Sequence, residues 1–195
     1  MIKHFQGIVL FFSILAFPAL ASAATMVFND EVYELQYAEC NKTSCMNEYV
    51  RPTENLENWT DLVTIHLFGS LTAKEYVNHM KTVITGTEGR ELMSEIPDAN
   101  LITFFIMSPY PNDRYIEYNV LFAKDSTDNM AIGVCQFTHK YRFEDEKSFK
   151  QAINNCFDDN LKYIKVMSKT DFPSVQIKYY KKEVPKSSKK SKNKS

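Results

Sequence analysis

Glycine is scarce in this chain: its 195 residues include 5 glycines, fewer than the usual share of about 7%. They form neither G-x-G-x-x-G nor G-x-x-x-x-G-K-[ST], the patterns in which backbone amides approach a phosphate closely. The sequence also lacks G-x-S-x-G, H-E-x-x-H and a paired D-x-D. We therefore predict no catalytic residue from a motif, no cofactor and no metal site.

Long hydrophobic runs are also rare, and the one present lies at the N-terminus. Residues 8–20 are apolar apart from Ser13 and Pro18, Lys3 precedes them, and Ala21-Ser22-Ala23 follows. A charged start, an apolar stretch shorter than a membrane span and a small-x-small site are typical of a signal peptide. We predict that residues 1–23 are removed and that the protein is periplasmic or secreted, with no transmembrane segment left.

Cysteines are few but even in number: Cys40, Cys45, Cys135 and Cys156. An exported chain with four cysteines can form disulfides in three connectivities. No C-x2-C is present, so a zinc site is disfavoured. Cys40 and Cys45 can close a tight loop, and Cys135–Cys156 is the bridge that remains, although two buried free thiols fit the same positions.

Hydrophobic periodicity predicts the fold class. A hydroxyl cap with a carboxylate three residues on, Thr72 and Glu75, predicts the start of an amphipathic helix that ends near Gly86. Alternating or continuous apolar runs predict strands near residues 33–37, 46–50, 62–68, 101–107, 114–124, 130–143 and 175–179. We predict one α+β domain over residues 24–180, an antiparallel sheet of about five to seven strands covered by two amphipathic helices.

The second helix is predicted to begin near Asp145 to Ser148. Its predicted core-facing residues recur at spacings of three and four: Phe149, Ile153, Cys156, Phe157, Leu161, Ile164 and Met167. Cys156 lies on this stripe, and Cys135 lies on the more apolar side of the preceding strand. The two thiols are therefore predicted to face each other where the helix packs on the sheet.

Histidine supplies the candidate polar site. His66 and His139 lie on predicted strands and are expected to share a face near Trp59. Two such histidines can act as a general base or a metal pair. The alternative is that they are isolated polar residues of the sheet, since no local carboxylate partner is visible in the sequence.

The C-terminal segment, residues 181–195, is rich in lysine and carries a net charge of +6, whereas residues 24–180 carry −8. The positive charge comes from Lys181, Lys182, Lys186, Lys189, Lys190, Lys192 and Lys194. We predict a disordered tail that attaches to an anionic envelope polymer or an acidic protein; a solubilising terminus is the alternative. Nucleic acid is not an expected partner, because no aromatic residues are interleaved with the lysines.

One segment resembles a known group of proteins. Asn47-Glu48-Tyr49-Val50-Arg51-Pro52, then Glu54 and Asn58-Trp59-Thr60, is similar to a segment, N-E-Y-x-x-P-x-E-x-x-x-N-W-T, of small uncharacterised exported bacterial proteins. The resemblance implies a bacterial exported protein and no particular activity. The predicted order of strands and helices is also similar to that of PsbP-like folds, a likeness of architecture alone.

Three functions remain open from the sequence. The leading hypothesis is a non-catalytic binding or interaction protein of the bacterial envelope with an unknown ligand. The second is a small hydrolase or ligand-processing enzyme that uses His66 or His139. The third is a periplasmic inhibitor or immunity-type protein that binds another protein.

Overall fold

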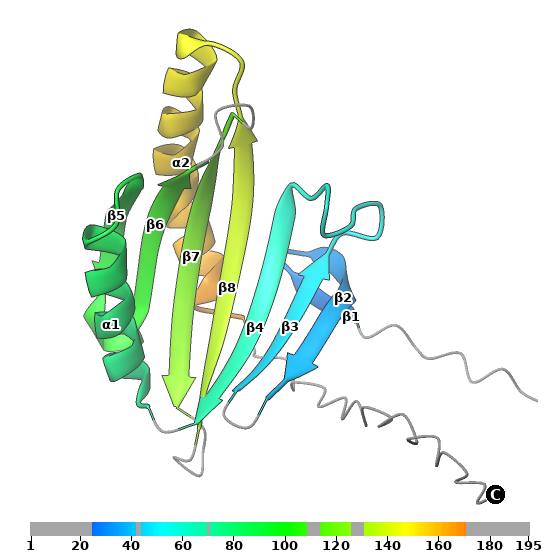
Figure 1. Cartoon of the computed structure of the whole chain (residues 1–195), viewed down its shortest axis with the longest axis vertical. Helices are drawn as coiled ribbons and strands as arrows, with labels where there is room; N and C mark the ends of the chain where they lie inside the picture. Colours follow the sequence, from blue (N-terminus) through cyan, green and yellow to red (C-terminus); the bar gives the residue numbers. More distant parts are fainter. Residues whose placement is uncertain (1–24, 42–43, 70, 109–113, 126–130, 171–195) are drawn as a thin grey trace, which may run out of the picture.

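The computed structural model describes residues 25–41, 44–69, 71–108, 114–125 and 131–170. These residues form one eight-stranded antiparallel sheet and two α-helices (Figure 1). In chain order the elements are β1 (Thr25–Phe28), β2 (Glu31–Cys40), β3 (Ser44–Val50), β4 (Asp61–Gly69), α1 (Ala73–Thr85), β5 (Arg90–Ile96), the 3-10 turn Pro97–Ala99, β6 (Leu101–Met107), β7 (Tyr115–Asp125), β8 (Ala131–Arg142) and α2 (Glu146–Met167). The α+β prediction is confirmed.

The sheet consists of two four-stranded meanders joined in its middle. Its strand order is β1-β2-β3-β4-β8-β7-β6-β5, so the first meander meets the second where β4 pairs with β8. α1 connects β4, at the middle of the sheet, to β5 at one edge. The predicted meander of the last three strands is confirmed as β6, β7 and β8.

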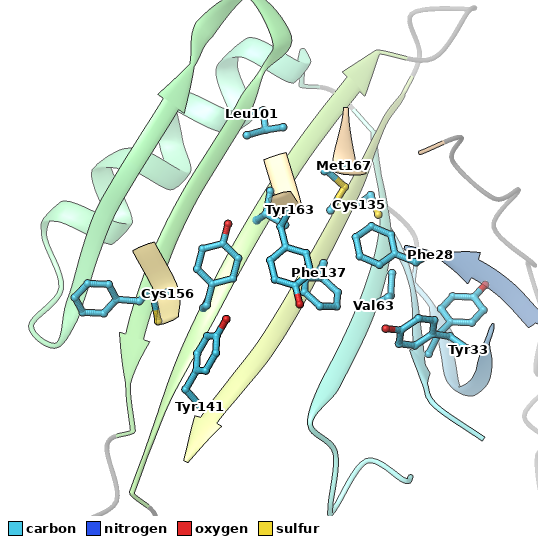
Figure 2. Packing of buried hydrophobic residues seen from close by; sticks show 14 of the residues in the cluster. Phe28, Tyr33, Val63, Leu101, Cys135, Phe137, Tyr141, Cys156, Tyr163 and Met167 are labelled. Atoms are coloured by element: carbon cyan, nitrogen blue, oxygen red, sulfur yellow. The ribbon is translucent and has the colours of Figure 1, made fainter. Parts of the chain in front are cut away.

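The two helices pack on opposite faces of the sheet. α1 buries Ala73, Val77 and Ile84 against β6, β7 and β8. α2 packs on the other face, where Tyr163 lies 4.6 Å from Phe137 between ring centroids (Figure 2). Figure 1 shows no helix in front of β2, β3 and β4 on the side that carries α1.

Local signals explain where both helices begin. The Thr72 side chain accepts from the Glu75 amide, and Glu75 accepts from the Thr72 amide at 2.9 Å, so the predicted capping box is present. At α2, Asp145 accepts from the Ser148 amide at 2.7 Å, and Ser148 accepts in return. Both devices satisfy amides that the first helical turn leaves unpaired.

The sheet has eight strands, one more than the upper bound of the prediction, and β1 and β5 are the two strands that were not predicted. β1 has four residues and turns back through Asn29 and Asp30, both with positive φ, as a type I′ hairpin requires. β5 contains an irregularity between Leu92 and Ser94, which disrupts the alternation that reveals a strand in sequence. The predicted strand at 175–179 lies outside the described residues, as do residues 1–23 and 181–195.

The predicted apolar stripe of α2 is wrong at two positions. Phe157 and Leu161 are 54% and 76% exposed, whereas Asn160 and Tyr163 are buried. Asn160 is satisfied inside the protein, since it accepts from Tyr118 Oη at 3.1 Å and donates to Ser94 Oγ at 2.8 Å. Hydrogen bonding therefore allows a polar residue where periodicity predicts an apolar one.

Neither described helix is both long and apolar enough to cross a membrane.

Candidate functional site

His66 and His139 do not form the predicted pair, because they lie on opposite faces of the sheet. His139 of β8 is directly opposite Asp61 of β4, and His66 is five residues further along β4. Alternate residues of a strand point to opposite faces. His139 therefore lies on the α2 face and His66 on the α1 face, which rules out a shared metal or a two-histidine mechanism.

His139 has a carboxylate partner that the sequence did not reveal. Its Nδ1 contacts Asp61, whose side chain is 3% exposed and whose other oxygen pairs with Arg51. Arg51 Nε also donates to Glu31 at 2.6 Å. The sequence hides the pair because its members lie 78 residues apart, and only the β4–β8 register brings them together.

This arrangement fixes the histidine ring. A carboxylate on Nδ1 leaves the other ring nitrogen, Nε2, as the atom that can accept a proton. Tyr141 packs against the imidazole, with ring centroids 4.3 Å apart, and donates through its hydroxyl to Asp159 of α2 at 2.5 Å. The histidine side chain is 20% exposed, so Asp61 and His139 form an oriented and partly accessible pair.

Trp59 belongs to a different cluster. Its ring covers Lys140, whose Nζ lies 3.5 Å from the ring centroid and 4.7 Å from that of Tyr115. Lys140 Nζ also lies 3.8 Å from the Oε1 atom of Glu117, with which it forms an ion pair. Burial raises the pKa of Glu117, and Lys140 partly opposes that rise. Trp59 thus fastens the 51–60 loop to the sheet through a cation–π contact.

An open face remains on the α1 side of β2, β3 and β4. The strand register places on it, among other exposed or half-buried residues, the following: Glu34, Tyr37, Glu39, Met46, Glu48 and His66. Tyr37 donates to Glu39. Among the described residues, no lysine or arginine lies on this open face, so its three carboxylates face no cation there.

Glu48 is the central acid of the open face. It lies between Tyr37 of β2 and Thr64 of β4. Its carboxyl makes no hydrogen bond or ion pair with any other described residue. Burial raises the pKa of Glu48, because removal from water disfavours the charged form.

His66 borders the open face and is part of an aromatic stack. Its ring lies 5.4 Å from that of Phe68, which lies 5.2 Å from that of Tyr76 in α1. Burial lowers the pKa of His66, so the imidazole is neutral near pH 7. We assign His66 the role of a packing residue at the border of the open face that is nearest to α1.

The cysteines match one predicted bridge and contradict the other. Cys40 and Cys45 form a disulfide at the end of the β2–β3 hairpin. Cys135 and Cys156 are free and buried. Figure 2 shows Cys135 beside Met167 and Cys156 well apart from it; eleven helical residues separate Cys156 from Met167, about 16 Å of helix, so the thiols cannot meet.

The described residues contain no group of three or more His, Cys, Asp or Glu that could hold a metal ion. The seven lysines of residues 181–195 lie outside the described part of the chain.

Comparison with known proteins places the chain in a family without assigning an activity. Neither the curated proteins nor the solved structures contain a match to it. The sequence model of a protein family matches residues 20–172, which cover most of the chain and all described elements. The chain therefore belongs to this family of uncharacterised bacterial proteins.

Proposed function

We propose that this protein is a non-catalytic binding protein of the bacterial envelope and that its open face binds a lysine- or arginine-rich segment of a partner. The observation that carries the proposal is Glu48, a partly desolvated carboxylate without a cation among the described residues. An incoming ammonium or guanidinium group would supply the missing opposite charge. Glu34 and Glu39 extend the negative field along β2.

The apolar members of the open face favour the same class of partner. Tyr37 and Met46 flank the carboxylates, since Tyr37 pairs with Glu48 and Met46 pairs with Glu39. Lysine and arginine carry long aliphatic stems that pack on apolar surface while their charged ends reach a carboxylate. Alternating acid and apolar positions therefore suit a basic segment better than a single small cation.

A decalysine peptide provides a direct test. Binding to the full chain at low ionic strength should weaken about fivefold in a Glu39→Gln/Glu48→Gln variant, because each partly exposed ion pair contributes up to about 1 kcal/mol. The matched control is Glu88→Gln/Glu91→Gln, which removes the same charge at exposed positions near β5, the opposite edge of the sheet. Equal weakening in both variants would show only a general charge effect and would overturn the proposal.

The Asp61–His139 pair favours a second function, a small hydrolase in which His139 accepts a proton from water. Hydrolysis of a p-nitrophenyl ester should then fall to the buffer rate in His139→Gln and remain unchanged in His66→Gln. Equal rates of hydrolysis in the wild-type protein and in both variants would exclude a hydrolase that uses His139.

An inhibitor or immunity-type role would use the open face against a basic surface of its target. It predicts that one protein co-purifies in a one-to-one complex and is lost in the Glu39→Gln/Glu48→Gln variant.

A further inference from the structure

We infer that the lysine-rich segment of this chain, residues 181–195, binds its own open face and competes with an external partner. The inference rests on the proposed function of that face. It specifies which basic segment occupies the face when no partner is present, and it makes partner binding a displacement reaction.

Charge complementarity is the first argument. The segment carries seven lysines and one acid, and it has no apolar residue from Lys186 onward. The open face presents Glu34, Glu39 and Glu48 with no cation among the described residues. A basic segment tethered to an acidic surface is held near it by the Coulomb attraction, which is strongest at low ionic strength.

The position of the last described residue is the second argument. Thr170 and Lys169 line a shallow cavity together with Val27, Asn29 and Asp30 of the β1–β2 hairpin. The described chain therefore ends beside β1, the edge strand that adjoins the open face.

Reach is the third argument. Residues 171–180 can span at most about 35 Å when extended. Two strand spacings, about 10 Å, separate β1 from β3. Glu34 lies four residues beyond Asp30, about 13 Å along the strand, and Tyr37, which is opposite Glu48, lies seven residues beyond it, about 23 Å. The lysines can therefore reach Glu34 and Glu48 around the β1 edge.

The tether determines the size of the effect. A segment joined by a short linker has an effective concentration on the order of 1 mM at its site. If the free segment binds with a dissociation constant on the order of 0.1 mM, the face is about nine-tenths occupied by the chain's own lysines. An external basic peptide then binds about tenfold more weakly than it would to an unoccupied face.

The test compares two full-length variants that lose the same charge. In the first, five lysines of the segment become glutamine: Lys186, Lys189, Lys190, Lys192 and Lys194. In the second, five lysines on or just after α2 become glutamine: Lys147, Lys150, Lys162, Lys165 and Lys169. The labelled decalysine peptide is titrated into each protein at low ionic strength.

We expect the first variant to bind decalysine about tenfold more tightly than the wild-type protein and the second to differ by less than twofold. Equal affinities in the two variants would overturn the inference. If decalysine binds and its affinity depends on Glu48, but the lysine variants agree, only this inference fails. If decalysine does not bind any form of the protein, the proposed function fails with it.

Carbodiimide cross-linking gives an independent readout. We expect amide links from lysines 186–194 to Glu39 or Glu48 within one monomer, and a mixture of isotopically labelled and unlabelled chains distinguishes these from links between copies. Links that fall only on other carboxylates would contradict the assigned surface.

Discussion

Asp61 joins three segments of the chain through one carboxylate. It contacts His139 of β8 and Arg51 of the 51–60 loop, and Arg51 continues to Glu31 at the start of β2. A buried carboxylate with two partners is costly to remove, because the cationic partner then loses its counter-charge. At the scale of single residues, Asp61 therefore organises this side of the sheet.

Replacement of Asp61 should accordingly be among the most destabilising single polar changes. We expect Asp61→Asn to lower the free energy of unfolding by about 2–4 kcal/mol, measured by urea denaturation at neutral pH. Glu91→Gln, at an exposed position on β5, should change it by less than about 0.5 kcal/mol. Similar values for the two variants would show that the Asp61 contacts are not formed in solution.

Glu48 should reduce the stability of the folded protein at neutral pH. Its pKa is raised in the folded protein, so the folded state binds more protons than the unfolded state and becomes less stable as pH rises through that range. We expect Glu48→Gln to raise the free energy of unfolding at pH 7 by less than about 1 kcal/mol. At a pH below the unfolded pKa of glutamate the two proteins should be equally stable, and a benefit that persists there would exclude this explanation.

The thiols give a prediction about the cysteines. Burial raises the pKa of Cys135 and Cys156 to about 12. Both thiols are therefore protonated at neutral pH and are out of reach of a reagent in solution. Titration with a thiol reagent should find none in the native protein, two after denaturation without reductant and four after reduction. If no free thiol were found in the denatured, unreduced protein, Cys135 and Cys156 would have to be joined by a disulfide after all.

At the scale of elements, α2 shows how burial departs from periodicity. Leu161→Ala should cost less than about 0.5 kcal/mol, because the side chain is 76% exposed. Met167→Ala, at a fully buried position of the same helix, should cost about 2–4 kcal/mol. Chemical denaturation of both variants checks the difference, and a large loss at Leu161 would mean that another surface covers it.

The predictable elements are those in which local signals agree with packing. The capping box at Thr72 and the alternation of Ile116, Tyr118 and Val120 marked α1 and β7 correctly. β5 was missed because its irregularity interrupts the alternation. β1 was missed because four residues are too few to reveal a period.

The candidate site could be predicted only in part. The sequence singled out His139 but not Asp61, because their contact depends on how β4 pairs with β8. The open face was equally hidden. Glu34, Tyr37 and Glu48 form one surface only through the register of β2 with β3, including the shift between Leu35 and Tyr37.

At the scale of the whole molecule, the near-neutral total charge conceals two opposed parts. Residues 24–180 and 181–195 carry −8 and +6. If the basic segment binds the open face, the radius of gyration measured by small-angle scattering should be larger at about 0.5 M salt than at low salt. The variant with five glutamines in the segment should show no such change, and an equal change in both would attribute the expansion to something other than the lysines.

The pairing of β4 with β8 sets the order in which this sheet can be completed. β1 to β4 are joined by local hairpins or a short loop, but β4 must pair with residues 131–139, which lie 62 to 78 positions later. Contacts of such long sequence separation form slowly. The two meanders therefore cannot join until β8 has been synthesised, and β4 has no partner on that side for as long as the intervening residues are being made.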